Sequence, residues 1–167
     1  GKSQNWRIRA DAARKINNQQ VLLDIIKNNN DPDFLDNIID RLTDQELIVE
    51  YIKSHSLSSS LSFVFDRITD QNTLSDVARN GASPKIRQEA ASRIFDLKIL
   101  LGIMENESSP EVRKAAVSNI SDQQALIGIA SNDPGKMVRE EAVRKIKDQN
   151  ILGRIARNDA EKDVRII

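Results

Sequence analysis

The residues most able to do chemistry lie in one serine-rich segment. The only histidine of the chain, His55, lies in SHSLSSSLS, residues 54–62. A Ser–His nucleophile requires two side chains that converge in space and an acid that orients the imidazole, so adjacency in sequence is weak support for it. We interpret the segment as a serine-rich turn, and we predict no catalytic residue in this chain.

Other chemical patterns are equally incomplete. GKS at residues 1–3 resembles the end of a phosphate-binding loop, but it lacks the glycine-rich turn and the strand that such a loop requires. The carboxylate pairs 31/33 and 140/141 have neither EF-hand spacing nor a supply of histidine and cysteine ligands around them. We therefore expect these carboxylates to be solvated, and we predict no metal and no cofactor.

The composition gives the chain no overall attraction to nucleic acid or to a membrane. The 25 Lys and Arg residues balance 25 Asp and Glu residues, so no net field attracts nucleic acid or an anionic membrane. No apolar run approaches the roughly 20 residues of a membrane-spanning helix, and we expect no membrane partner. The absence of cysteine fits a reducing compartment, and we expect a cytoplasmic location.

One sequence unit recurs every 26 residues. VRKAAVSNISDQQALIGIASND, residues 112–133, returns as VREEAVRKIKDQNILGRIARND, residues 138–159. Steps of 26 residues give an aliphatic column, which contains Ile16, Leu42, Ile68, Ile94, Ile120 and Ile146. Two residues later comes a polar column of Asn18, Asp44, Asp70, Asp96, Asp122 and Asp148, and Gln follows in five of these six copies. Columns kept in register over six copies predict a repeat architecture.

Each unit has the pattern of two short helices. Val112, Ala116, Val117 and Ile120 stand at i, i+4, i+5 and i+8, which is one stripe of an α-helix, and the other half of the unit has a similar stripe. A leucine-rich repeat of similar period would need an aliphatic residue where each unit has a polar one, for example Glu105. The sequence therefore favours helices in both halves of the unit.

Helices this short are marginal alone and gain stability by stacking. We predict an all-α fold, an α-solenoid (α-α superhelix) of about six two-helix repeats in one domain over 1–167. The predicted repeats are 8–33, 34–59, 60–85, 86–111, 112–137 and 138–163. VRII at residues 164–167 would begin a seventh second helix, so we expect a longer array or a partner at this end. SDQQ from Ser121 and TDQE from Thr43 match capping boxes at the start of first helices.

The phrases VRKAAV and VREEAV, each preceded by an acidic turn, resemble the second helix of HEAT-type repeats in the armadillo/HEAT class. The likeness covers nearly the whole chain, although the unit is shorter than the ~40–47 residues usual in that class. Leucine-rich repeat variant proteins are similar in having short units, in which one helix can be 3₁₀. The resemblance implies a helical superhelix whose second helices line the concave face.

The HEAT resemblance also implies a structural ladder between a turn acid and an Arg of the second helix. Six residues separate each acid from its Arg in three units, whose pairs are Glu107 with Arg113, Asp133 with Arg139, and Asp159 with Arg165. Where Leu35 and Leu61 replace the Arg, the turn residue six positions earlier is also non-acidic, and Gly81 before Arg87 is the exception. We predict that these arginines orient the stack and do not bind anions.

A basic column on the second helices is the candidate binding site. Steps of 26 residues give its members, which are Lys15, Arg41, Arg67, Arg93, Asn119 and Lys145, and we add the neighbouring Arg144 to the candidate site. One interpretation is a concave stripe that binds an acidic peptide or a phosphate backbone. The alternative, which we favour, is that each cation complements a helix C-terminus and pairs with the Asp three residues later.

Three functions follow as hypotheses. The first is a non-enzymatic scaffold whose concave face binds a protein or peptide. The second is nucleic-acid binding through the basic column. The third is an enzyme like those HEAT-like proteins that act on a modified base or a pigment, although fold does not imply function. The sequence favours the first, because the repeat spans the chain and no catalytic set converges.

Overall fold

The computed structural model describes residues 2–29, 31, 34, 38–54 and 62–158, and these are helical or irregular with no strand among them. The first helices of successive units are α2 (Gln19–Lys27), α4 (Gln45–Ser54), α6 (Gln71–Asn80), α8 (Leu97–Asn106), α10 (Gln123–Asn132) and α12 (Gln149–Asn158). The second helices are α5 (Ser62–Phe65), α7 (Pro84–Ala91), α9 (Pro110–Asn119) and α11 (Lys136–Lys145). The N-terminal region has α1 (Lys2–Ala13) and a 3₁₀ helix, η1 (Ile39–Arg41).

The repeated Asp starts each first helix. Asp70, Asp96 and Asp122 are N-caps with extended backbone, and each side chain accepts the N–H of the residue three positions later. Such a cap satisfies an amide that the helix itself leaves unpaired and contributes about 1 kcal/mol. The capping boxes predicted at Ser121 and Thr43 are wrong by one residue, because the Asp after each of them accepts the bond. Helix α10 begins at Gln123, so Asp122 and not Ser121 is the residue directly before it.

The second helices begin with a different signal. Ser83 and Ser109 are N-caps, and a Pro follows each of them at the first helical turn, where its missing N–H costs nothing. At α11 the N-cap is Gly135, which has no side chain to cap with. The Ser-Pro dipeptide thus fixes where α7 and α9 begin.

The aliphatic columns form one continuous core. The column that contains Ile94 is buried from Leu42 to Ile146, and the column that contains Leu100 is buried from Leu22 to Leu126. Ala90, Ala116 and Ala142 are fully buried where α7, α9 and α11 pack against one another. The aromatic side chains of Tyr51 and Phe65 are part of this core and are 3% and 1% exposed. The core is therefore built by the positions that the columns predict.

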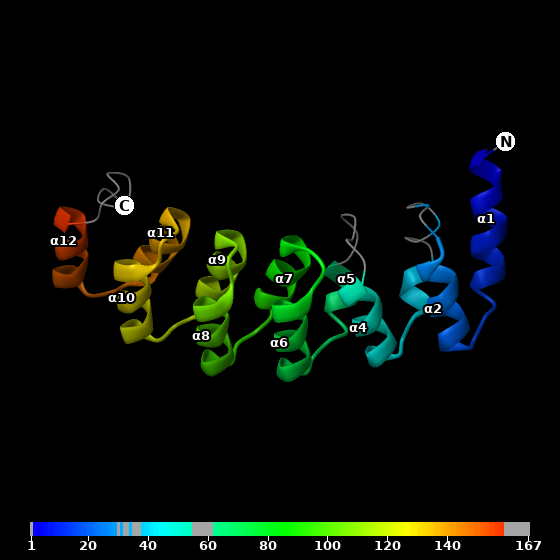
Figure 1. Ribbon diagram of the computed structural model, residues 1–167, viewed down its shortest axis with the longest axis horizontal. Helices are drawn as coiled ribbons and strands as arrows, with labels where there is room; N and C mark the ends of the chain where they lie inside the picture. Colours follow the sequence, from blue (N-terminus) through cyan, green and yellow to red (C-terminus); the bar gives the residue numbers. More distant parts are fainter. Residues whose placement is uncertain (1, 30, 32–33, 35–37, 55–61, 159–167) are drawn as a thin grey trace.

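The helices stand side by side in a single row from α1 to α12 (Figure 1). A unit of the structure is a first helix with the second helix that follows it, so it spans the border between two predicted repeats. Within units α6 packs on α7, α8 on α9 and α10 on α11, and second helices pack on their neighbours along the row. Every helix in the described ranges is too short or too polar to cross a membrane. The row has many junctions between units, and the polar contacts at these junctions decide which side chains remain for binding.

Candidate binding surface

Arginines of the second helices, one half-buried and one buried, join successive units. Arg87 of α7 donates from Nε and Nη2 to the two carboxylate oxygens of Glu107, at 2.7 and 3.1 Å. Arg113 of α9 binds Asp133 in the same two-pronged way, with both distances 2.9 Å. In each pair the acid lies 20 residues after the arginine, in the turn of the next unit. These pairs link one unit to the next.

The same arginines also bind their own unit, through the main chain. The Nη1 atoms of Arg87, Arg113 and Arg139 donate to the carbonyl oxygens of Gly81, Glu107 and Asp133, each six residues earlier. The predicted spacing of six residues thus corresponds to a carbonyl contact, while the carboxylate binds the arginine of the preceding unit. This arrangement explains why the turn residue Gly81 is not an acid. The residue 20 positions before it is Leu61, so no arginine is present there for a carboxylate to bind. Arg165 and Asp159 lie outside the described residues.

Burial makes this ladder structural. The side chains of Arg113 and Asp133 are only 7% and 5% exposed. The hydrogen bond that Arg113 donates to Asp133 raises the pKa of Arg113 despite its burial. Burial disfavours the charged form of Glu107, but the hydrogen bonds from Arg87 and the Ser109 N–H outweigh it and lower the pKa of this carboxyl. Arg87 and Arg113 each bind a carboxylate and a main-chain carbonyl oxygen, which supports a structural role for them.

The basic column is used in a similar way. Side chains of the column reach the carbonyl oxygens at the end of the preceding second helix: Arg67 Nη1 donates to Leu42 O at 2.7 Å, and Asn119 Nδ2 donates to Ser92 O at 2.7 Å. Lys145 Nζ donates to Val117 O at 3.1 Å and also to Ser118 O. Helix C-termini have unpaired carbonyls and a partial negative charge, which these donors satisfy. The complemented C-terminus therefore belongs to the preceding unit.

Arg93 departs from this pattern, because it binds carboxylates. Its Nη2 lies 2.8 Å from Asp66 Oδ1, and its Nη1 lies 2.6 Å from Glu89 Oε1. Its guanidinium also lies over the Phe65 ring, 5.5 Å from the centroid. The predicted pairing with the Asp three residues later is replaced here by Asp66 and Glu89, since Asp96 caps α8.

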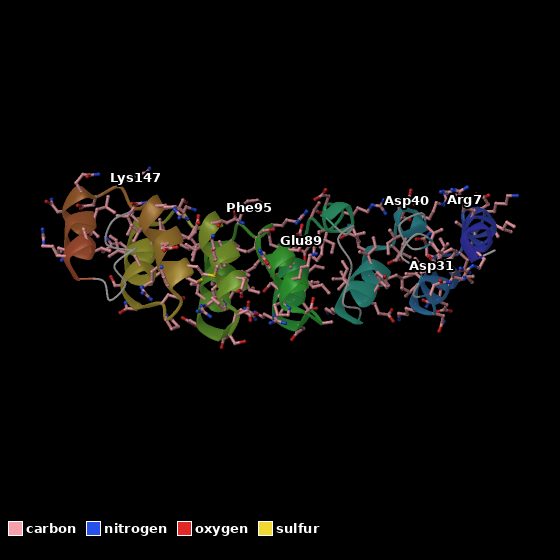
Figure 2. All side chains as sticks on the ribbon, turned by 90° about the horizontal axis from the view of Figure 1, so that it is seen from above. Arg7, Asp31, Asp40, Glu89, Phe95 and Lys147 are labelled. Carbon is pink, nitrogen blue, oxygen red and sulfur yellow. The ribbon has the colours of Figure 1, made fainter. Side chains whose placement is uncertain are left out.

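Three members of the candidate site remain at the surface. Lys15 and Arg41 are exposed, and Arg144 is exposed with a long contact of 3.4 Å to Glu141. The exposed positions just before the basic column change from unit to unit, as Arg14, Asp40, Asp66, Ser92, Ser118 and Arg144. Figure 2 shows Asp40, Phe95 and Lys147 directed outward along one long edge of the row. Phe95, which belongs to none of the aliphatic columns, is 72% exposed.

A glutamine clamp was missed by sequence reasoning, although its column was visible. Gln71, the first residue of α6, donates from Nε2 to Arg93 O at 3.2 Å and accepts from the Phe95 N–H at 2.7 Å. Gln19 and Gln123 bind the next unit in the same way. One side-chain amide thus binds a carbonyl oxygen and an N–H group in the short segment before the next first helix. The recurrence of Gln beside the N-cap Asp was the signal for this clamp.

The first helices carry a separate row of ion pairs. Lys27 of α2 binds Glu50 of α4, and Lys53 of α4 binds Asp76 of α6. In both pairs the acid lies 23 residues after the lysine. The hydrogen bond from Lys53 lowers the pKa of Asp76. The next pair of positions is Arg79 and Gly102, where the acid is absent.

An open groove of about 1000 Å³ lies between α6 and α8. Its lining includes Asn72 and Arg79 from α6, and Leu97, Leu101 and Gly102 from α8. Across the described ranges, no three His, Asp or Glu side chains are grouped so that they could hold one metal ion. The arrangement provides hydrogen-bond donors and apolar surface for binding.

Comparison with known proteins gives no match among family models, curated proteins or solved structures. The class is therefore described by the fold and by its contacts, as an all-helical protein built from paired short helices.

Proposed function

We propose that the chain is an α-solenoid of HEAT-like two-helix units, and that it binds another protein without chemistry of its own. The support for the solenoid is that equivalent contacts recur along the chain at fixed separations of 20 and 22 residues. Repeat proteins of this kind present long surfaces for partners.

One observation carries the binding function. The polar columns that recur between units, namely the capping Asp, the clamping Gln and the ladder Arg, are occupied by contacts within and between units. The side chains that change between units, such as Asp40, Ser92 and Ser118, stand exposed. Constant residues thus build the array, and variable residues are left to select a partner.

The same contacts weigh against nucleic acid as the partner. Binding to a phosphate backbone draws on several accessible cations. Arg67, Asn119 and Lys145 instead donate hydrogen bonds to carbonyl oxygens at the end of the preceding second helix. Of the predicted basic site, the exposed cations are Lys15, Arg41 and the neighbouring Arg144. No observation in the described residues favours the enzymatic alternative.

Photo-crosslinking tests this function. A photoreactive phenylalanine analogue is placed at Ser118, which is exposed on the second helix α9, and as a matched control at Asn132, exposed at the end of the first helix α10. After irradiation in a cell extract we expect a discrete protein adduct at Ser118 that resists nuclease, and a much weaker one at Asn132. Adducts that nuclease removes would instead support nucleic-acid binding, and equal labelling of both sites would overturn the proposal.

A further inference from the structure

The row of ion pairs between first helices stops at one place. Lys27 binds Glu50 and Lys53 binds Asp76, each across one junction between units. At the next junction the cation is kept as Arg79, while glycine, Gly102, occupies the position of the acid. The chain thus presents a cation in the geometry of a cross-unit ion pair without supplying the carboxylate.

Arg79 lies against the glycine. A Cβ atom built on Gly102 would lie 3.2 Å from Arg79 Nη2, the tightest contact that it would make. Arg79 is exposed and interacts electrostatically with Asp76 on its own helix, but it has no carboxylate within ion-pair distance among the residues that the structure describes. The equivalent lysines, Lys27 and Lys53, are partly covered by their partners. The guanidinium therefore borders open space where its predecessors hold a carboxylate.

The groove around Arg79 suits a peptide side chain. Leu97 is 38% exposed at one end of the lining, and Leu101 lies one turn further along α8 beside Gly102. Asn72 adds an amide group that can bind a main chain, while the amide nitrogen of Asn106 donates to Gly102 O at 2.8 Å. Of the two acids in the lining, Asp96 caps α8, and Glu105 stands one turn beyond Gly102 without pairing to Arg79. The Arg79 cation and the apolar side chains of Leu97 and Leu101 thus line the same groove.

We propose that the α6–α8 groove binds an acidic side chain of a partner protein, whose carboxylate pairs with Arg79 while an adjacent apolar residue packs on Leu97 and Leu101. The carboxylate takes the place that Glu50 and Asp76 occupy at the two earlier junctions. Arg and carboxylate form strong charge-assisted hydrogen bonds, and the planar guanidinium favours this pairing. The inference rests on the protein-binding function proposed above and adds a second surface, on the first helices.

Selection from a random phage-displayed heptapeptide library on the immobilised full chain tests the groove. We expect enrichment of peptides with Asp or Glu beside a large apolar residue. Fluorescence anisotropy then compares one enriched peptide with its Asn or Gln twin, which we expect to bind roughly tenfold more weakly. Gly102→Asp supplies the missing acid internally and should abolish both the enrichment and the difference between the twins. Arg79→Gln should do the same by removing the cation.

Gly128→Asp is the matched control. Gly128 occupies the equivalent position of α10, lies outside the groove, and has open space around it, since a Cβ atom added there would meet no side chain within 4 Å. This variant should keep the acid preference, and far-UV circular dichroism checks that all variants stay helical.

Three results would each overturn the groove proposal: no acid enrichment on the natural chain, enrichment that survives Gly102→Asp, or displacement of the peptide by an equal concentration of inorganic phosphate. A protein adduct at Ser118 together with such a result would leave the protein-binding function standing, whereas loss of both would reject both.

Discussion

The two halves of the row are joined by different polar contacts. Between α2 and α6, partly exposed lysines bind exposed acids across the first helices, as Lys53 binds Asp76 with side chains 32% and 45% exposed. Between α7 and α11, buried arginines bind acids across the turns, as Arg113 binds Asp133 with side chains 7% and 5% exposed. The exposed series ends at Arg79, and the buried series begins at Arg87.

This exchange shows how one unit can change its surface and keep its fold. A buried, two-pronged Arg–carboxylate pair fixes the orientation of neighbouring helices, and losing one partner is costly. An exposed Lys–carboxylate pair contributes little. Once the buried series fixes the junctions, the exposed acids are dispensable for stacking. Gly102 occurs at this changeover, and the groove between α6 and α8 opens there.

The largest expected effect tests the buried series. Asp133→Ala leaves the Arg113 guanidinium buried without its acid, and we expect a loss of about 3–5 kcal/mol in the free energy of unfolding. Urea denaturation followed by circular dichroism at 222 nm measures it.

The double variant Arg113→Leu with Asp133→Gly is the control, because it copies the natural combination of Leu61 and Gly81. We expect the double variant to be more stable than Asp133→Ala, since no charge is left buried. A double variant that is less stable than the single one would contradict the assigned pair.

The glutamine clamp is common to both halves and has the next largest effect. Gln123→Ala leaves the Lys145 carbonyl and the Lys147 N–H without their side-chain partner, and we expect a loss of about 1–2 kcal/mol. The matched control is Gln45→Ala, at the equivalent position of α4, where Gln45 is exposed and forms no side-chain hydrogen bond among the described residues. Equal losses of unfolding free energy for the two variants, measured by thermal or urea denaturation, would show that the clamp does not stabilise the fold.

The sequence was sufficient for the helices and the core but not for the partners of the polar columns. Aliphatic spacing predicted which side chains are buried, because period and burial are directly linked in a helix. Each ladder arginine has one turn residue six positions before it and another 20 positions after it. Because 6 and 20 sum to the repeat length of 26, both turn residues belong to the same sequence column, and a regular unit cannot show which of them the arginine side chain binds. Only an irregular unit separates the two, and Gly81 after Leu61 was that clue.

Helix caps give a smaller effect that distinguishes two adjacent residues. Asp122→Ala removes the acceptor for the Ala125 N–H at 2.8 Å, and we expect a loss of about 1 kcal/mol. Ser121→Ala, which alters the residue predicted from the capping box, should change stability by only a few tenths of a kcal/mol. Thermal unfolding of both variants measures the difference, and the reverse order would restore Ser121 as the cap.

The smallest effect is expected for the exposed series. Lys53→Met removes the ion pair with Asp76 while keeping the apolar stem, and we expect a loss below about 1 kcal/mol that shrinks further in high salt. The pair lowers the pKa of Asp76 from its ordinary 3.8, so its stabilisation is present above that pH and is lost as the pH falls through the lowered pKa. The unfolding free energies of the natural chain and Lys53→Met should therefore converge in acid. If this difference in unfolding free energy persisted at the lowest pH, the ion pair would not be its cause. If it exceeded the effect of Asp133→Ala, the stronger contacts between units would lie on the first helices, which would contradict the comparison.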